Sequence, residues 1–435
     1  MLTKRPRGTY DLLSPEVEGW QRLEEHIRTL CRRCGYTEVR TPIIEHTELF
    51  ERGVGETTDV VEKEMYTFED RGGRSLTLRP EGTAPTLRAY LENGLAKAPQ
   101  PVKLFYLAAP MFRFERPQAG RFRQHYQFGV EAVGSMDPAL DAEIISLPLM
   151  LLEELGAGSF VVRLNSIGCP KCRPAYREAL QAYYAPHKDK LCADCARRFH
   201  TNPLRLLDCK NERCAPFKAE APRTVDYLCD ECREHFDSLQ GYLRQLEIQF
   251  EIDPLIVRGL DYYTKTVFEV LDTGLGAQNT VCGGGRYDGL VESLGGPPTP
   301  GIGFGLGMER LMSLLAERNI NLGGSAPLDL FVATAGPEAR PTAVALVHRL
   351  RRKGLTVDMD YMGRSLKAQM RRADRYPARA VLILGEQEVA AGRAVIRHLA
   401  TGDETEVPLA GFEEIAAAVQ GAPAPARQGP EAGGV

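Results

Sequence analysis

Residues 301–312, GIGFGLGMERLM, restrict the possible fold most, because glycine occupies every second position of their first half. Successive residues of a β-strand point to opposite faces, so this spacing predicts a strand with one face free of side chains. Another backbone or a flat ligand can lie against such a face. Met308, Leu311 and Met312 follow at the spacing of one helix face, which predicts a helix directly after the strand. Tight packing at a strand–helix junction is the ordinary explanation, and a ligand site is the alternative.

Residues 112–131, FRFERPQAGRFRQHYQFGVE, have the pattern of a β-hairpin with Gly120 in its loop. Scattered arginines usually lie on a solvated surface. Four arginines in one hairpin favour instead a site for polyphosphate or nucleic acid, because the planar guanidinium group binds phosphate oxygens in pairs. The four are Arg113, Arg116, Arg121 and Arg123.

Residues 258–270, RGLDYYTKTVFEV, predict a strand that is entered through an arginine and two adjacent tyrosines. A surface turn before a strand is one explanation. The alternative is a polar pocket that binds an anion together with an aromatic or heterocyclic ligand. A phosphate-binding P-loop is excluded, since Thr264 stands where that motif needs its second glycine.

Three stretches together resemble the signature motifs of the class II aminoacyl-tRNA synthetases. GYTEVRTPIIEHTELFERGVG, around Pro42, resembles motif 1, which forms the dimer; the arginine hairpin resembles motif 2, and residues 301–312 resemble motif 3. Residues 258–270, RPEGT at 79–83 and GGGRYDGL at 283–290 are similar to the histidine-specific elements of the histidyl-tRNA synthetase family. The resemblance covers nearly the whole chain.

The resemblance implies that ATP and L-histidine react to histidyl-adenylate, after which histidine passes to the terminal ribose of tRNA(His). Both reacting groups are anions, so the reaction needs positive charge and positioning rather than a general base. Arg113 and Arg258 resemble the family's catalytic arginines on two sides of the α-phosphate. At His125 the family usually has a phenylalanine that stacks on adenine, and imidazole stacks over less area. The implied ATP site is Arg113, Glu115, Arg121, His125 and Arg310.

A histidine pocket is also implied by the resemblance. A neutral imidazole has one N–H donor and one acceptor nitrogen. Glu131 would accept the N–H, the Tyr263 hydroxyl would serve the other nitrogen, and Glu81, Thr83 and Gln127 would hold the α-ammonium group. The full set is Glu81, Thr83, Gln127, Glu131, Tyr262, Tyr263 and Tyr287.

The expected architecture is α+β: a class II synthetase-like antiparallel sheet flanked by helices, with an inserted, mainly helical Cys-rich domain and a C-terminal α/β anticodon-binding domain. Strand and turn signals alternate over residues 36–134, and a βαβαβ series follows Leu328. The expected parts are residues 1–165 (catalytic, first part), 166–250 (Cys-rich insertion), 251–324 (catalytic, second part), 325–421 (anticodon binding) and 422–435 (flexible tail).

Most of the 11 cysteines fall within residues 169–232, as four close pairs. Each pair can place two thiolates on one ion, so four pairs suffice for two tetrahedral Cys₄ zinc sites. Reduced core thiols are the alternative. The first pair can join the last, with the middle two together, or neighbours can combine. The expected zinc role is structural and remote from Arg258. The pairs are Cys169 and Cys172, Cys192 and Cys195, Cys209 and Cys214, and Cys229 and Cys232.

The formal net charge of −4 means that any contact with nucleic acid must come from local basic patches. No apolar run approaches the ~20 residues of a membrane span, and the N-terminus lacks the apolar core of a signal peptide. We therefore expect a cytoplasmic protein. By resemblance it is a homodimer that takes L-histidine, ATP with Mg²⁺, and tRNA(His).

Two other functions fit parts of the sequence. A non-catalytic histidine-binding paralogue, like the regulatory subunit of ATP phosphoribosyltransferase, shares the catalytic fold but lacks the anticodon domain. Residues 328–421 and the intact Arg113, Arg258 and Arg310 argue against it. A zinc-containing RNA-binding protein without catalysis would have no need of the histidine pocket.

Overall fold

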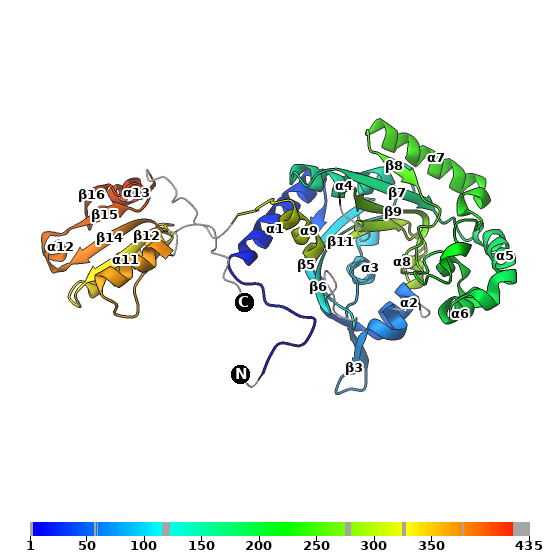
Figure 1. The fold of residues 1–435 in the computed structure, drawn as a ribbon, viewed down its shortest axis with the longest axis horizontal. Coiled ribbons are helices and arrows are strands. Elements are labelled where there is room, and N and C mark those ends of the chain that lie inside the picture. Colours follow the sequence, from blue (N-terminus) through cyan, green and yellow to red (C-terminus); the bar gives the residue numbers. More distant parts are fainter. Residues whose placement is uncertain are drawn as a thin grey trace. The chain divides into compact units, whose positions relative to one another are not determined.

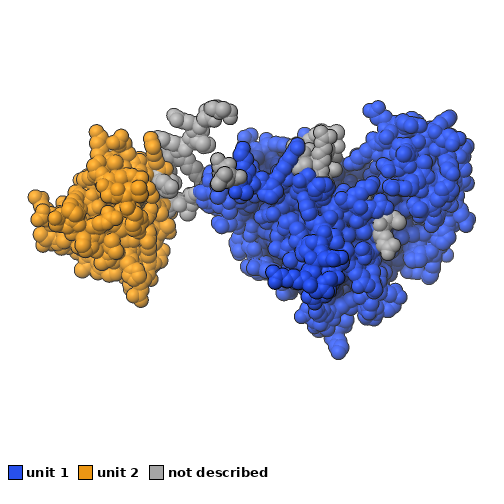
Figure 2. Space-filling view, turned by 90° about the horizontal axis from the view of Figure 1, so that it is seen from below, with its two compact units in different colours: residues 1–323 blue, residues 324–435 orange. Residues whose placement is uncertain are grey.

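The computed structural model describes residues 3–55, 58, 60–114, 122–274, 280–323, 328–375 and 378–420. The chain divides into two compact units, residues 1–323 and residues 324–435 (Figure 1, Figure 2). The narrower domain boundaries expected from the sequence stay predictions. In the described part of the chain, no helix combines the length and the apolar character that crossing a membrane requires.

The first unit is built on a sheet whose described residues form eight strands in the order β1-β5-β6-β11-β10-β9-β7-β8. Pairing is antiparallel from β5 through to β7, whereas β1 and β8 join the two edges in parallel. This largely antiparallel sheet confirms the expected α+β class. The strands are β1 (Thr37–Glu38), β5 (Val102–Phe112), β6 (Gln124–Val133), β7 (Phe160–Ser166), β8 (Phe250–Ile252), β9 (Thr264–Asp272), β10 (Thr280–Arg286) and β11 (Gly301–Gly307).

One face of this sheet is apolar and carries the main core. Alternate residues such as Phe128, Phe268 and Phe304 point into it and pack against helices on that side. Burial of these large side chains supplies most of the stabilisation of the unit. The helices are α1 (Glu16–Arg33), α4 (Pro138–Glu154), α7 (Asp230–Gln245) and α9 (Met308–Glu317).

The opposite face carries the intervening residues, among them Gln127, Glu131 and Glu269. Because successive side chains of a strand point to opposite faces, the same strands carry core residues on one face and polar residues on the other. Two helices near this face pack around Tyr287. The unit also contains a small sheet of three strands. The helices are α3 (Thr83–Glu92) and α8 (Leu290–Ser293); the small sheet is β2 (Ile44–His46), β4 (Ser75–Leu78) and β3 (Tyr66–Glu69). Also in this unit are α2 (Thr47–Val54), the π-helix η1 (Val60–Glu64) and the 3₁₀-helix η2 (Leu95–Lys97).

The segment between β7 and β8 contains all four cysteine pairs and is mainly helical, as expected. It has a small apolar cluster of its own around Tyr176, Leu180 and Phe199. Its elements are α5 (Arg173–Tyr184), η3 (Ala185–Lys190), α6 (Ala193–Thr201), η4 (Pro203–Leu206), η5 (Ala215–Phe217), η6 (Thr224–Tyr227) and α7.

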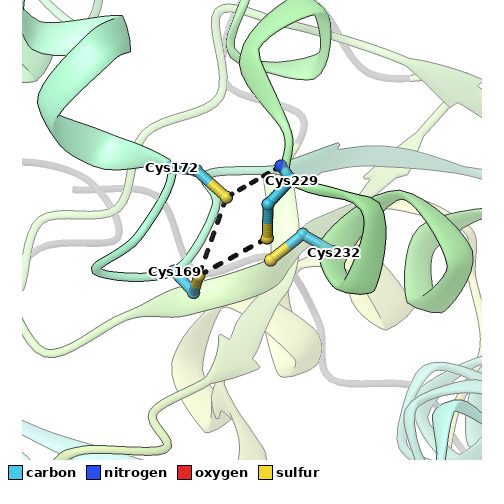
Figure 3. Close-up of side chains that lie close together, drawn as sticks. All are labelled: Cys169, Cys172, Cys229 and Cys232. Carbon is cyan, nitrogen blue, oxygen red and sulfur yellow. Dashed lines mark hydrogen bonds between the residues drawn. The ribbon is translucent and has the colours of Figure 1, made fainter.

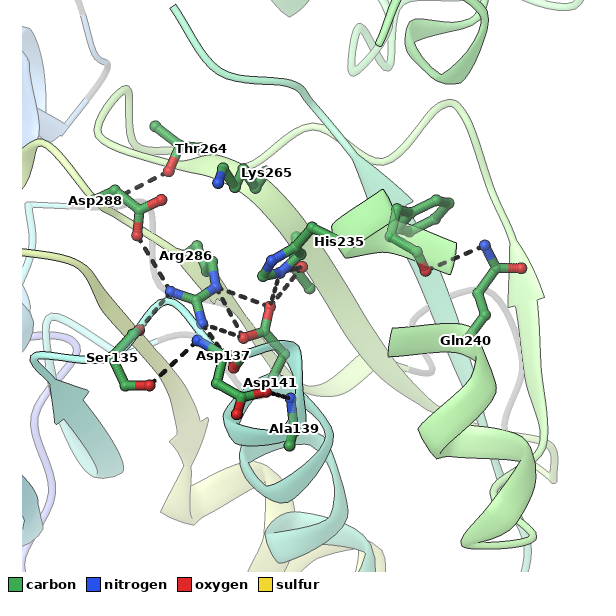
Figure 4. A network of polar contacts seen from close by, with 12 residues as sticks. Ser135, Asp137, Ala139, Asp141, His235, Gln240, Thr264, Lys265, Arg286 and Asp288 are labelled. Atoms are coloured by element: carbon green, nitrogen blue, oxygen red, sulfur yellow. Dashed lines mark hydrogen bonds and ion pairs between the residues drawn. The ribbon is translucent and has the colours of Figure 1, made fainter. Parts of the chain in front are cut away.

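A buried polar network, which His235 of α7 joins, links this segment to the sheet (Figure 4). Arg286 of β10 donates from Nε to Asp141 of α4 at 2.8 Å, and both side chains are fully buried. His235 of α7 and Thr266 of β9 contact the same carboxylate at 2.9 and 2.7 Å. Burial opposes ionisation of Asp141, but His235 and Arg286 outweigh it, so the pKa of Asp141 lies below its usual value. The network fixes β10 immediately before Tyr287.

The second unit contains the predicted βαβαβ series. Its described strands lie in the order β13-β12-β14-β15-β16; the first three run parallel, and the last two add antiparallel. α10 and α13 pack in one apolar cluster and α11 in another. The elements are β12 (Leu328–Ala335), α10 (Arg340–Arg352), β13 (Val357–Met359), α11 (Leu366–Arg375), β14 (Ala378–Gly385), α12 (Glu386–Ala391), β15 (Arg393–His398), β16 (Glu404–Pro408) and α13 (Phe412–Gln420).

Candidate active site and cysteine clusters

Three arginines from distant parts of the sequence line one cavity of about 250 Å³ in the first unit. Arg113 follows the end of β5, Arg258 precedes β9, and Arg310 lies in the first turn of α9. Among the described residues that line the cavity, Glu309 is the one carboxylate. Positive charge therefore exceeds negative charge in this wall, and the cavity suits a polyanion.

Each of these arginines is held by a hydrogen bond from within the fold. Arg258 Nη1 donates to Glu269 Oε1 at 2.7 Å, and its guanidinium lies 5.8 Å from the centroid of the Tyr263 ring. Arg113 Nε donates to the carbonyl of Pro80 at 2.9 Å, and Arg310 donates to the carbonyl of Thr280. Such anchoring presents the charges in a fixed geometry.

His125 of β6 lines the same cavity. Burial, together with the positive charge of Arg113, lowers the pKa of His125 to about 4. The ring is therefore neutral near pH 7 and offers a flat surface to a base rather than an additional charge. Of the expected ATP site, Arg113, His125 and Arg310 lie together; Glu115 and Arg121 lie outside the described residues.

Glu131 lies at the centre of the predicted histidine pocket, on the polar face of β6. Thr83 Oγ1 donates to its Oε1 at 2.8 Å, and the Tyr287 hydroxyl donates to its Oε2 at 2.6 Å. Burial raises the pKa of Glu131 to about 8, although these hydrogen bonds oppose the shift. Near pH 7 the group is therefore mostly a neutral carboxyl, which keeps acceptor capacity for a ligand. The sequence placed Thr83 and Tyr287 in the predicted pocket but did not reveal that they donate to Glu131.

Glu81 and Gln127 differ in how their buried oxygens are used. Glu81 accepts from the backbone N–H groups of Thr83 and Ala84 at 2.7 and 2.8 Å, so it caps the start of α3. Burial is the largest influence on Glu81 and raises its pKa. Gln127 Oε1, by contrast, is buried without a hydrogen-bond partner among the described residues. An unpartnered buried acceptor is costly, and a ligand's ammonium group would satisfy it.

Three tyrosines form an aromatic wall beside these groups. The ring centroids of Tyr262 and Tyr263 are 4.6 Å apart, and those of Tyr262 and Tyr287 are 5.9 Å apart. Burial raises the pKa of each hydroxyl, so all three stay neutral at ordinary pH. Tyr263 also lies beside Arg258, which joins the aromatic wall to the cationic cavity.

The alternating glycines of β11 make room for the site's own side chains. A Cβ added at Gly303 would lie 2.0 Å from Glu131 Oε2, and one at Gly305 would lie 2.2 Å from Gln127 Nε2. The expectation of a bare strand face open to a flat ligand is therefore wrong at Gly303, whereas Gly305 lines the cavity of the arginines. The neighbouring strand β6, paired in register, fills that space with polar groups.

Three functional-site residues were missed in the sequence. Glu269 anchors Arg258, and its position on the polar face of β9 was a usable signal. Glu309 accepts from the Tyr10 hydroxyl and the Tyr126 N–H, both at 2.8 Å. Tyr106 fills the space that Gly82 and Gly129 leave open, a contact between distant segments that no local pattern reveals.

The four cysteine pairs combine into two clusters. The Cys169 cluster joins the first pair to the last (Figure 3), and the Cys192 cluster joins the middle two. Within each cluster the four sulfur atoms lie within 4.8 Å of one another, and all are free thiols. The Cys169 cluster is Cys169, Cys172, Cys229 and Cys232; the Cys192 cluster is Cys192, Cys195, Cys209 and Cys214.

The spacing of these sulfur atoms matches a tetrahedral metal site. Four sulfurs at ~2.3 Å from one ion are about 3.8 Å apart. Cys169 Sγ lies 3.6 Å from Cys172 Sγ and 3.9 Å from Cys229 Sγ, and Cys192 Sγ lies 3.8 Å from Cys209 Sγ. The eight cysteines therefore fit two Cys₄ sites, in one of the two arrangements that the sequence left open.

The backbone around the clusters also favours thiolates. Cys192 and Cys229 occupy the N-cap positions of α6 and α7, where the helix dipole stabilises negative charge. Cys172 Sγ accepts from the Cys229 N–H at 3.2 Å, and Cys214 Sγ accepts from the Cys192 N–H at 3.3 Å. Burial works against ionisation of Cys169, but nearby N–H groups outweigh it and lower its pKa to about 7.

Comparison with known proteins decides the family. The family model "Histidyl-tRNA synthetase" matches residues 8–311, and the model "Anticodon binding domain" matches residues 329–418. The histidine–tRNA ligase of Pelotomaculum thermopropionicum is 54% identical over 411 residues, 94% of this chain and 96% of that protein. The chain belongs to the histidyl-tRNA synthetase family. The Moorella thermoacetica histidine–tRNA ligase is 55% identical over 410 residues, covering 94% of this chain and 97% of that one.

Solved structures agree with this family assignment. Apo histidyl-tRNA synthetase of S. aureus has a TM-score of 0.81 at 38% identity and covers 96% of this synthetase and 99% of its own chain. A Bacillus halodurans C protein described as an ATP phosphoribosyltransferase regulatory subunit/histidyl-tRNA synthetase shares the fold, with a TM-score of 0.60 at 21% identity over 88% of this chain. The match to the anticodon-binding model favours a synthetase over the regulatory paralogue.

Proposed function

We propose that this chain is a histidine–tRNA ligase, which activates L-histidine with ATP and transfers it to tRNA(His). The observation that carries the proposal is the convergence of Arg113, Arg258 and Arg310 on one cavity beside the buried pocket of Glu131 and the tyrosines. The family of its close relatives supports it as well.

In the proposed first step, the carboxylate of histidine attacks the α-phosphorus of ATP. A bond forms between a carboxylate oxygen and phosphorus, and the bond to the bridging oxygen breaks, releasing pyrophosphate. Arg113 and Arg258 would stabilise the charge that develops on the phosphoryl oxygens. Mg²⁺ bound to the phosphates would neutralise part of their charge. The adenylate then reacts with the terminal ribose hydroxyl of tRNA, and AMP leaves.

Recognition of histidine would depend on the buried carboxyl of Glu131 and the tyrosine hydroxyls. An analogue without an imidazole N–H could not donate to Glu131 and would lose the hydrogen bond that histidine adds to those from Thr83 and Tyr287. Gln127 Oε1 would take the α-ammonium group, and the neutral ring of His125 would lie against the adenine. ATP, L-histidine, tRNA(His), a homodimeric state and a cytoplasmic location belong to the same proposal.

Each cysteine cluster would bind one zinc ion. The segment that holds them has a small apolar core of its own, so the metal would contribute folding free energy directly.

Histidine-dependent exchange between ATP and pyrophosphate tests the proposed activity. Arg258→Ala should lower the exchange rate by about 10²–10³-fold while histidine binding is retained, because the charge acts on the transition state. Arg393→Ala, at an exposed arginine of the second unit, is the matched control and should exchange normally. An exchange rate within tenfold of wild type for Arg258→Ala would show that its assigned role is wrong.

A further inference from the structure

The loop that carries Arg258 is anchored from the segment that contains the cysteines. Arg205 Nη1 donates to the backbone carbonyl of Arg258 at 2.8 Å. Asn202 Nδ2 donates to Asp261 Oδ1 at 3.0 Å. Both contacts join residues that are more than fifty positions apart in the sequence. They link the cysteine segment to the loop before β9. They hold the backbone from which the catalytic guanidinium extends.

Asn202 and Arg205 belong to the part of the chain that the Cys192 cluster closes into a loop. α6 carries Cys192 at its N-cap and Cys195 in its first turn, and it ends at Thr201, next to Asn202. η4 then carries Arg205, and Cys209 follows it. A metal bound by these cysteines would therefore fix both ends of the short stretch that contacts Arg258.

The Cys169 cluster anchors the other end of the same loop. The carbonyl of Gly168, beside Cys169, accepts from the Lys265 N–H at 2.9 Å, and Arg173 donates to the carbonyl of Tyr263. Lys265 has a φ of 46°, a left-handed conformation that costs a non-glycine residue free energy. Its Nζ contacts Glu231, between Cys229 and Cys232, at 2.9 Å.

Polar and apolar contacts both join the loop to the cysteine segment, since Val257 packs against the apolar cluster of that segment. A cavity of about 480 Å³ lies between the loop and the cysteine segment, lined by Arg173, Asn202, Arg205, Arg258 and Asp261 among others. Because side chains do not fill this space, the hydrogen bonds across it contribute to the position of the loop.

We propose that the two cysteine clusters, when they hold metal, position the loop of residues 258–265 for histidine activation, and that Asn202 and Arg205 are positioning residues. This inference rests on the proposed function. It differs from the expectation of a zinc role remote from Arg258, because the segment closed by the Cys192 cluster contacts that residue directly. The zinc would act through the loop and not at the reacting atoms.

Arg205→Ala tests the first part of the inference. A misplacement of about 1 Å at a catalytic group can lower a rate by 10²-fold, so we expect kcat for pyrophosphate exchange to fall about tenfold or more. The zinc content should stay close to wild type. Arg205→Lys keeps one N–H donor and should recover part of the rate. Arg177→Ala is the matched control, because Arg177 lines the same cavity but donates to His200 within the cysteine segment.

The metal is tested with the double variant Cys192→Ser/Cys209→Ser in the full-length protein. Wild type should contain two zinc ions per chain and the variant should contain one. The kcat of the variant should fall by the same factor as that of Arg205→Ala. Adding Arg205→Ala to this variant should lower the rate little further, since both changes act through the same contact. If the effects of Arg205→Ala and of the double cysteine variant on the rate multiply, the proposed coupling is wrong. If folded wild type contains no metal and its thiols are reactive, the proposed metal sites are wrong.

The outcomes also separate this inference from the proposed function. If wild type shows no histidine-dependent exchange, both fail together. If wild type exchanges normally and Arg205→Ala behaves like Arg177→Ala, the ligase stands and the positioning role is wrong. Should the double cysteine variant lose its circular dichroism signal, the comparison of Arg205→Ala, Arg205→Lys and Arg177→Ala still decides whether the contact matters.

Discussion

Glu131 is a buried acid whose protonation links the histidine pocket to stability. Its pKa in the folded protein, about 8, lies above that of an unfolded glutamate. The folded state therefore binds the proton more tightly, and the free energy of unfolding falls as pH rises from about 4.5 to about 8. In the proposed function, the same burial would favour a ligand that can donate to this carboxyl.

Glu131→Gln removes this titration. Between pH 5.5 and pH 8 the thermal midpoint of wild type should fall relative to that of the variant, by a few degrees. A free-energy change of 1 kcal/mol moves the midpoint of a large domain by about 2–4 °C. Differential scanning calorimetry at the two pH values measures it, with histidine-dependent exchange as the second readout. A difference that does not change with pH would contradict the raised pKa of Glu131.

His125 stands where a larger aromatic ring would stack better on a base. His125→Phe should lower the KM for ATP by about twofold to tenfold, since aromatic contacts contribute roughly 0.5–1.5 kcal/mol. The KM for histidine should not change, because the histidine pocket lies around Glu131. Steady-state exchange with each substrate varied in turn separates the two. An unaltered KM for ATP would assign His125 to core packing.

Strand β11 shows how one element serves two functions. Its apolar residues Ile302, Phe304 and Leu306 fill the core, and its glycines accommodate the polar side chains of β6 on the other face. The strand thus holds the histidine pocket in register with the cavity of the arginines.

Gly303→Ala should disturb the histidine pocket, because its Cβ would lie 2.0 Å from Glu131 Oε2. We expect a loss of about 1–3 kcal/mol in stability from overpacking and a higher KM for histidine. Gly307→Ala is the control for folding, since its Cβ would lie 3.9 Å from the nearest atom, the Cβ of Arg310. Equal thermal midpoints for the two variants would show that the space over Gly303 is not limiting.

At the scale of the whole molecule, the residues proposed for activation all belong to the first unit and the anticodon-binding match belongs to the second. Each unit has its own apolar clusters. We therefore expect adenylate formation and anticodon binding to be separable in the chain.

Removal of residues 325–435 should leave pyrophosphate exchange intact but lower the rate of tRNA charging by about tenfold or more, as contacts to tRNA are lost. Circular dichroism and size measurement must show that the shortened protein keeps its fold and its oligomeric state. Equal charging by the full-length and shortened proteins would contradict an anticodon-binding role for the second unit.

The sequence by itself determined what local patterns encode. The βαβαβ series, the helix after Met308 and the strands of the hairpin follow from residue periodicity, which depends on neighbours along the chain. The family followed from motifs in a fixed order, and Arg113, Arg258 and Arg310 were identified in the same way.

Only the tertiary structure decided which groups meet. The joining of the first cysteine pair to the last, the anchoring of Arg258 by Glu269 and by Arg205, and the two donors to Glu131 are contacts between distant segments. The same limit explains the error at Gly303 of β11, where the open face is filled from β6. Such contacts depend on the register and packing of separate elements, and no local pattern specifies them.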